Sequence, residues 1–304
     1  MLNRIRFFRE RGWEEISPED YARLWQRHGG SVVTHPVFVE RLSGLAEIPT
    51  RYLGWRSEGE LVAAIPAWGR HLALSMRALK AVGKKKCFDL GDAEVILPVA
   101  EGARGVPLRH VGSNLSARHA THFTGLKQQK ETLAFLKESD VFSSNFRKNQ
   151  RRKYRKFEEA GGFYRPVSDF SPSELAGIYL DLFQRRWGFP AAGAERMTEV
   201  FTLLRDWMRG MVIFLDDAPV AMQVLYQVES PQWVSVEDIN GGVDPRFLDL
   251  SPGNVVTYLN TNAARKEASE LGKTLRYSFG RYSPGYAGCA YKSHWCLFEP
   301  VYRV

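Results

Sequence analysis

The sequence predicts an α/β (α+β) protein with two similar domains in tandem, residues 1–140 and 141–304, each a mixed, mainly antiparallel sheet flanked by helices. Two observations support this prediction. The 304 residues are enough for two domains of roughly 100–150 residues each. The order helix, helix, strand, tight turn, strand also occurs twice, first from Ser17 and again from Ser171. Because helix pairs often precede hairpins, and the two copies share almost no sequence identity, coincidence stays open as an alternative.

The first copy begins where Ser17 can cap a helix, with a proline and two acids directly after it. Apolar residues at helical spacing continue this helix to the glycine pair 29–30. A second helix is expected over residues 35–45. Residues 51–69 then have the composition of a β-hairpin, with the turn at residues 57–60.

The second copy repeats these signals. Ser171 is followed by a proline and a glutamate, and the helix is expected to run through about Trp187. A further helix is expected within residues 193–210. The apolar residues 211–228 then form a second hairpin, with the turn at residues 216–219.

The excess positive charge of the chain is concentrated in one segment. Residues 147–156 contain seven basic residues and no acid, whereas the whole chain has a net charge of +8. A nucleic-acid-binding protein usually spreads its positive charge over a wide face, so sequence-specific DNA binding is not expected. The segment instead indicates contact with a smaller anionic ligand, such as CoA, tRNA or a lipid head group.

This basic segment is expected to form a helix over residues 143–160, ended by Gly161 and Gly162. Its buried stripe is expected to consist of four residues at helical spacing: Phe146, Gln150, Tyr154 and Phe157. Arg147, Arg151 and Arg152 lie outside this stripe and are candidate contacts for an anionic substrate. The alternative is a solvated helix with no ligand.

The last part of the chain gives the strongest signal for a binding site. A strand over residues 232–240 leads through a loop to Ser251, a candidate helix cap, and the following helix runs to Gly272. The backbone amides of Gly253 and Asn254 would lie at the start of this helix, where an anion is favourably bound. We therefore predict that Ser251, Gly253 and Asn254 bind substrate.

Several classes of protein are not expected. The chain contains no run of 18 apolar residues, so we expect no membrane span, and its basic N-terminus lacks the apolar segment of a secretory signal. Three cysteines make no disulfide framework and fit a reducing cytoplasm. His110, His119 and His122 have no nearby acid or cysteine to complete a metal site, so no metal is expected.

The C-terminal half resembles a known family. The residues Ser-Pro-Gly at 251–253, Y-x-F-G at 277–280 and Y-K-x-x-W at 291–295 resemble the FemAB-like branch of the GNAT acyltransferase superfamily. The arginine-rich segment from Phe146 resembles the helix that opens this half of the branch. Residues 29–38 and the chain length are most similar to the Mig-14 family, which is known for resistance to antimicrobial peptides. The branch often has aspartate where this chain has Ser278.

The resemblance implies two tandem GNAT-like domains and an N-acyltransferase that uses acyl-CoA or aminoacyl-tRNA as donor substrate, with no tightly bound cofactor. By analogy, Lys292 supplies the cation that stabilises a developing negative charge. Tyr291, Tyr286 or Tyr282 relays a proton or packs against the acyl group, and Trp295 borders the pocket. Glu237 and Asp238 are candidate bases that point to opposite faces of a strand, so at most one faces the cleft; Glu237 is taken as the catalytic candidate.

Two functions remain open. The first is a cytoplasmic FemAB-like acyl- or aminoacyltransferase, acting on an amine of an envelope-related acceptor, with a role in peptide resistance and virulence and with peripheral contact to the inner membrane. The second is a catalytically inactive GNAT-like regulator that binds DNA or membrane lipid through the basic helix. The helix start at Ser251–Gly253 and the loop at Tyr291–Lys292 are expected to converge on one pocket, because ligands collect where strands end at one edge of an open sheet.

Overall fold

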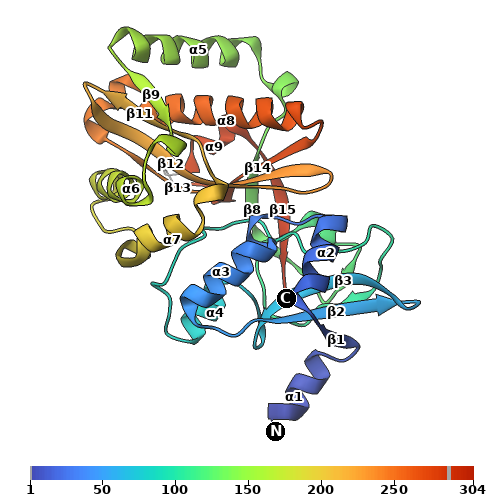
Figure 1. The fold of residues 1–304 in the computed structure, drawn as a ribbon. Coiled ribbons are helices and arrows are strands. Elements are labelled where there is room, and N and C mark those ends of the chain that lie inside the picture. Colours follow the sequence, from blue (N-terminus) through green and yellow to red (C-terminus); the bar gives the residue numbers. More distant parts are fainter. Residues whose placement is uncertain (1, 286–288) are drawn as a thin grey trace.

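The computed structural model describes residues 2–285 and 289–304. Its first half contains a sheet in the order β1-β2-β3-β4, with α2, α3 and α4 close to it (Figure 1). The elements of this half are α1 (Leu2–Arg9), β1 (Trp13–Ile16), α2 (Pro18–His28), α3 (Pro36–Ala46), β2 (Arg51–Ser57), β3 (Glu60–Trp68), β4 (His71–Leu72), α4 (Met76–Ala81), β5 (Val106–Pro107), β6 (Leu115–Ser116), β7 (Phe123–Thr124) and β8 (Lys127–Leu136).

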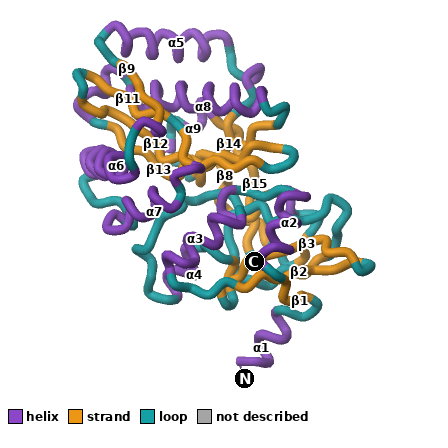
Figure 2. Tube along the Cα trace, viewed as in Figure 1, coloured by secondary structure: helices purple, strands orange, loops and turns teal. Residues whose placement is uncertain are grey.

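The second half is built around a larger sheet in the order β6-β15-β8-β14-β13-β12-β11-β9, with β10 paired to β12 (Figure 2). Its elements are α5 (Ser144–Glu159), β9 (Phe163–Pro166), α6 (Pro172–Trp187), α7 (Met197–Leu203), β10 (Met208–Arg209), β11 (Met211–Leu215), β12 (Ala218–Glu229), β13 (Trp233–Val243), α8 (Pro252–Glu270), β14 (Thr274–Tyr282), α9 (Lys292–Trp295) and β15 (Cys296–Arg303).

Both predicted repeats of helix, helix and hairpin are present. The hydroxyl of Ser17 accepts a hydrogen bond from the backbone N–H of Asp20 at 3.0 Å, which satisfies one of the free amides at the start of α2. Ser171 and Glu174 form a capping box at the start of α6. The helix expected within residues 193–210 is shorter than predicted: α7 ends at Leu203, and a 3₁₀ turn leads from it into β10.

The larger sheet is covered on both faces. Val224, Tyr226 and Val228 of β12 pack with residues of α6 and α7 in one hydrophobic cluster. Leu225, the intervening residue, packs with Ala264 of α8 in another cluster. Side chains that alternate along a strand in this way point to opposite faces, so α6 and α7 cover one face and α8 covers the other.

The basic helix forms a further layer over α8 (Figure 1). It begins after Ser143, whose hydroxyl accepts a hydrogen bond from the N–H of Phe146 at 3.1 Å. The predicted buried stripe faces inward: Gln150 and Phe157 are buried, and the Tyr154 ring lies 5.8 Å from that of Tyr258 in α8. The sequence therefore predicted both the ends and the buried face of α5.

The strands β13 and β14 are parallel neighbours that separate before they end. Their pairing runs from Trp233 opposite Thr274 to Glu237 opposite Ser278. Beyond this point β13 continues to Val243 beside β12, and β14 continues to Tyr282 beside β8. The two strands therefore diverge at their C-terminal ends, where the binding site was predicted.

The larger sheet crosses the predicted domain boundary. Strand β8 lies within residues 1–140, yet it pairs with both β14 and β15 of the second half. The chain then ends beside the first half, where the N–H of Val304 donates to the carbonyl of Gly112 at 3.1 Å. A boundary between residues 140 and 141 therefore does not separate the two sheets, because β8 lies before it and belongs to the larger sheet. The division into two domains stays a prediction.

A buried cluster of charges joins the two halves. The Arg276 guanidinium of β14 donates two hydrogen bonds of 2.5 Å to the carboxylate of Glu94 and one of 2.8 Å to Glu299. Glu94 is only 1% exposed. A carboxylate so far from water is stable only with a partner, so Arg276 fixes the segment around Glu94 against the sheet.

We predict that Arg276→Gln lowers the free energy of unfolding by about 3–5 kcal/mol, because it leaves the Glu94 carboxylate buried without its cation. Arg56→Gln is the control: Arg56 and its partner Glu14 are each 49% exposed, and such a pair contributes about 0–1 kcal/mol. Urea denaturation at pH 7 measures both changes. The double variant Glu94→Gln/Arg276→Gln should recover part of the loss, and equal effects of Arg276→Gln and Arg56→Gln would contradict this role.

Candidate active site

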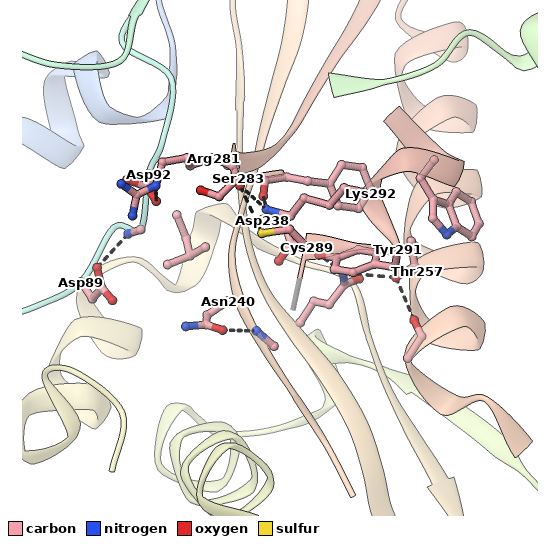
Figure 3. A pocket seen from close by; sticks show the side chains of 18 of the residues that line it. Asp89, Asp92, Asp238, Asn240, Thr257, Arg281, Ser283, Cys289, Tyr291 and Lys292 are labelled. Atoms are coloured by element: carbon pink, nitrogen blue, oxygen red, sulfur yellow. Dashed lines mark hydrogen bonds and ion pairs between the residues drawn. The ribbon is translucent and has the colours of Figure 1, made fainter. Parts of the chain in front are cut away.

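A cavity of about 1320 Å³ lies between the two halves, where β13 and β14 diverge (Figure 3). Arg77 of α4 and Lys130 of β8 contribute to its wall from the first half. Arg186 of α6 lines it on one side of the larger sheet and Thr257 of α8 on the other. The cavity therefore extends between the diverging strands, with wall residues on both faces of the sheet.

The structure brings together most of the residues predicted for the site. The cavity wall includes Ser251, Gly253, Asn254, Tyr291, Lys292 and Trp295. The start of α8 and the segment at α9 thus meet at one cavity, although many residues separate them in the sequence. That these residues bind or transform a substrate stays a prediction. Tyr286, which was also predicted to bind substrate, lies outside the described residues.

The start of α8 leaves the backbone N–H of Gly253 near the cavity, whereas the N–H of Asn254, which was also predicted to bind an anion, is already paired within the chain. Ser251 has a left-handed φ of 54° and its side chain forms no cap hydrogen bond, so its expected role as a side-chain cap is wrong. Its carbonyl instead accepts from the N–H of Asn254 and of Val255. A Cβ added to Gly253 would meet only Val243, at 3.4 Å. Packing within the protein therefore does not require glycine here, and the backbone at residue 253 stays accessible from the cavity.

Lys292 is a buried cation in the cavity wall. It is 8% exposed, and its ammonium donates hydrogen bonds to the carbonyls of Phe279, at 2.5 Å, and Arg281, at 2.8 Å. Both carbonyls belong to the part of β14 that has separated from β13. Lys292 therefore stabilises the diverging strand as well as placing a positive charge beside the cavity (Figure 3).

The structure places Asp238 in the cavity wall and Glu237 outside it, which corrects the choice of Glu237 over Asp238. Three acids from the first half also line the cavity: Asp89, Asp92 and Glu131. Glu237 is 1% exposed and does not line the cavity. Its carboxylate accepts from the N–H of Glu94 at 3.1 Å, on the face of β13 that meets the first half. Asp238 points to the other face and lines the cavity, as the alternation of strand side chains requires.

The surroundings of Asp238 change its proton affinity. Burial raises the pKa of this carboxyl to about 7, although the positive charges of Lys292 and Arg186 and a hydrogen bond from Gln223 act in the opposite direction. An acid with a pKa near neutrality can accept a proton in a reaction and release it afterwards. Burial together with the nearby Glu94 also raises the pKa of Glu237, but that carboxyl has no access to the cavity.

Two aromatic residues at α9 have different positions. Tyr291 lines the cavity, and burial, with the charge of Asp238 adding to it, raises the pKa of its hydroxyl. Trp295 is 2% exposed and packs against Phe142 and Phe146, with its ring 5.1 Å from that of Phe146. Trp295 thus supports one end of the cavity wall and also links it to α5.

The arginines of α5 are not part of this site. Arg147, Arg151 and Arg152 are exposed and do not line the cavity. The reason is the layer order, because α8 lies between α5 and the sheet. The Arg147 guanidinium instead donates to the carbonyls of Ser139 and Phe142. The structure thus separates these arginines from the cavity, and their contact with a substrate stays a prediction.

Other cations take their place in the cavity wall. No ion pair in the described part of the chain involves the following cavity residues: Arg77, Lys80, Lys130, Arg186 and Arg303. Arg281 is paired with Asp92 at 3.2 Å. The wall therefore has more free positive than free negative charge and favours an anionic ligand. Within residues 2–285 and 289–304 we find no group of three histidine, cysteine or acidic side chains arranged to hold a metal ion.

Sequence reasoning missed the polar residues behind Asp238. Gln223 of β12 and Asn260 of α8 are both buried. Gln223 donates a hydrogen bond to the Asp238 carboxylate, and Asn260 donates one to Gln223. A single glutamine or asparagine in an apolar segment is a weak signal. The spacing of Gly253, Thr257 and Asn260 was the available indication, since residues four and three positions apart lie on one face of α8.

Comparison with solved structures shows the class of fold: the chain shares a mixed α/β fold with FemX over nearly its whole length, as the predicted FemAB-like fold requires. FemX is 11% identical, with a TM-score of 0.59 over 95% of this chain and 96% of that chain. L-PGS from Bacillus licheniformis is 13% identical, with a TM-score of 0.50 over 95% and 92%. The C-terminal domain of a putative lysylphosphatidylglycerol synthetase from Agrobacterium fabrum is 12% identical, with a TM-score of 0.50 over 94% and 90%.

The chain belongs to the Mig-14 family, whose model matches residues 35–304. The family predicted from the sequence is therefore confirmed. A comparison with curated proteins found no match. In the part of the chain that the structure describes, every helix is too short or too polar to cross a lipid bilayer.

We predict that Asp238→Asn changes how stability depends on pH. The folded protein holds a proton on Asp238 up to about pH 7, whereas the unfolded chain releases it near pH 4. The contribution of Asp238 to wild-type stability therefore falls as pH rises from 4 to 7, and the variant lacks this loss. The free energy of unfolding of Asp238→Asn, relative to that of wild type, should therefore rise by on the order of 1–3 kcal/mol between pH 4 and pH 8.

Urea denaturation at pH 4, 5, 6, 7 and 8 measures this difference. Asp140→Asn is the matched control, because Asp140 is exposed in the segment before α5. Its curve should stay parallel to that of wild type. An Asp238→Asn curve parallel to wild type over the same range would show that this carboxyl titrates like an ordinary surface acid.

Proposed function

We propose that this protein is an acyl- or aminoacyltransferase that transfers its group to an amine in the cavity between β13 and β14. The main support is the position of Asp238 and Lys292, which face the same part of a cavity with wall residues on both faces of the sheet (Figure 3). An acceptor can reach Asp238 from one face while the donor approaches along the start of α8 from the other. A proton acceptor and a buried cation are the two groups that acyl transfer to an amine requires.

The reaction follows from these positions. The amine nitrogen attacks the carbonyl carbon of a thioester or ester, and a C–N bond forms while a negative charge develops on the carbonyl oxygen. Asp238 accepts the proton that the attacking amine loses. The C–S or C–O bond then breaks, and the departing thiolate or alkoxide takes up the proton that Asp238 returns. Lys292 stabilises the negative charge, because a fixed cation in a partly dry cavity acts more strongly than one in water.

The cavity charge supports an anionic donor substrate that binds only for the reaction. Acyl-CoA and aminoacyl-tRNA are both anionic. The free cations of the wall and the backbone N–H of Gly253 can bind their phosphate groups. We therefore propose one of these two as donor, with no tightly bound cofactor.

Membership of the Mig-14 family supports a role in resistance to antimicrobial peptides and in virulence, through modification of an envelope-related acceptor. The name of one structural relative, a putative lysylphosphatidylglycerol synthetase, denotes an aminoacylated phospholipid, which is consistent with a lipid or other envelope acceptor. We propose that the protein acts in the cytoplasm, at the surface of the inner membrane. The exposed basic face of α5 is the part of the fold best suited to an anionic lipid surface; the alternative of an inactive regulator rests on this face alone.

A transfer assay tests the function. Purified protein is incubated with labelled acetyl-CoA or labelled lysyl-tRNA, and with phosphatidylethanolamine or an amine-bearing peptidoglycan precursor as acceptor. With the active pair, we expect the rate to rise with pH through a midpoint near 7, because Asp238 must be ionised. Asp238→Asn should lower this rate by about 10²–10⁴-fold, and Lys292→Met by about 10²-fold or more.

Lys273→Met is the matched control for Lys292→Met. The Lys273 ammonium also bonds a carbonyl, that of Ser230 at 2.6 Å, and forms an ion pair with Glu229, but Lys273 does not line the cavity. Both lysine variants should lose stability, and only Lys292→Met should also lose transfer. Full activity of Lys292→Met and Asp238→Asn would exclude the proposed site.

A further inference from the structure

A chain of buried hydrogen bonds leads from the backbone of β11 to the cavity. The N–H of Met211 donates to Oδ1 of Asn260 at 2.9 Å. The amide nitrogen of Asn260 donates to Oε1 of Gln223 at 2.8 Å. The amide nitrogen of Gln223 donates to Oδ2 of Asp238 at 2.6 Å. Asn260 and Gln223 are 2% and 7% exposed, so water has little access to replace these bonds.

The direction of every bond in this chain is determined by its first member. A backbone N–H can only donate, so the atom of Asn260 that faces Met211 must be the oxygen. The nitrogen of Asn260 then faces Gln223 and requires an oxygen there. The nitrogen of Gln223 is thereby directed at Asp238. Neither side-chain amide can turn over without placing two donors or two acceptors against each other.

A branch of the same network reaches the start of α8. The amide nitrogen of Gln223 also lies 3.4 Å from Oγ1 of Thr257. The Thr257 hydroxyl donates to the carbonyl of Gly253 at 2.8 Å. Gln223 therefore contacts, directly or through one side chain, both the carboxylate and the helix start that line the cavity.

We propose that Gln223 and Asn260 are positioning residues that hold Asp238 ready to accept a proton and keep it in register with the start of α8. A donor aimed at a carboxylate favours its ionised form. Without Gln223 in this orientation, Asp238 would stay protonated at higher pH and could not take a proton from the acceptor. This inference rests on the proposed transferase function, but the state of Asp238 can be measured without it.

The other groups near Asp238 cannot replace this donor. Lys292 of α9 and Arg186 of α6 favour its ionised form by charge. Burial raises the pKa of Cys296, in β15, to about 12. Three tyrosines also lie near this carboxyl, and burial raises the pKa of each of them: Tyr179, Tyr277 and Tyr291. All four groups are neutral at pH 7, and in the described part of the chain none of them forms a hydrogen bond to Asp238, whereas Gln223 does.

The test is a titration of Asp238 by ¹³C NMR in protein labelled at aspartate carboxyls, with the resonance assigned from its loss in Asp238→Asn. Gln223→Leu removes the donor and should raise the midpoint of Asp238 by about one to two pH units. Gln223→Glu should raise it further, since it adds a second carboxyl beside Asp238. Asn260 does not contact Asp238, but Asn260→Leu removes the group that orients the Gln223 amide. This variant should therefore also raise the midpoint of Asp238.

Gln227 provides the matched control. It lies four residues further along β12 on the same face, is 5% exposed and donates to Glu267 of α8 at 2.6 Å, in the same way that Gln223 donates to Asp238. Gln227→Leu should leave the titration of Asp238 unchanged. Circular dichroism and urea denaturation establish that each variant is folded, and Thr257→Val, which removes only the branch, serves as a mild second variant that should leave the midpoint of Asp238 in place.

If the transfer assay yields a reaction, the midpoint of its pH–rate profile should move upward with the NMR midpoint in Gln223→Leu and Asn260→Leu. If it yields none, the proposed transferase function fails, while the NMR titration still decides whether the hydrogen bonds through Asn260 and Gln223 control the protonation of Asp238. The inference is overturned if Asp238 titrates at the wild-type pH in both Gln223→Leu and Asn260→Leu, or if Gln227→Leu moves it by as much.

Discussion

The separation of β13 and β14 after Glu237 and Ser278 is the constraint on which the rest of the structure depends. Two parallel strands that stop pairing inside a sheet leave backbone groups and apolar surface without partners, and this costs free energy unless other parts of the fold satisfy them. In this protein a lysine satisfies part of β14 in place of a neighbouring strand. The Lys292 ammonium donates hydrogen bonds to two carbonyls of β14 beyond the point of separation. The same side chain thereby stabilises the opening and gives it a charge.

The two faces of the diverging strands have different tasks. On the face toward the first half, Arg276 ties Glu94 and Glu299 together and Glu237 accepts from the backbone of Glu94, so the paired part of the strands is rigid. On the face toward α8, Gln223 and Asp238 form a polar network that opens into the cavity. Of the two neighbouring acids in β13, Glu237 thus binds the first half of the chain, whereas Asp238 lines the cavity. The division of roles follows from strand geometry alone.

Much of the fold followed from local signals in the sequence. Ser17, Ser143 and Ser171 marked helix starts because a hydroxyl that accepts a backbone N–H is a short-range interaction. The meeting of Gly253 with Lys292 was predictable from the rule that ligand sites form at the ends of strands. The layer order was not: whether Arg151 faces the cavity depends on α8 lying beneath α5, which no local pattern encodes. The choice between Glu237 and Asp238 failed for the same reason, since alternation separates two faces without saying which one is open.

The position of β8 also affects how the chain can fold during synthesis. Phe135 of β8 pairs with Ser278 and Leu297, so this strand leaves the ribosome long before its partners exist and stays an unpaired sheet edge in the meantime. Its first half, which contains Lys127, Lys130 and Glu131, is charged, and charged side chains on an open edge disfavour pairing with other chains. Its apolar second half has no such protection. A nascent chain of this protein therefore carries the apolar segment around Leu133–Leu136 without its sheet partners until β14 and β15 have been synthesised, and an unpaired apolar strand exposes the chain to aggregation during that interval.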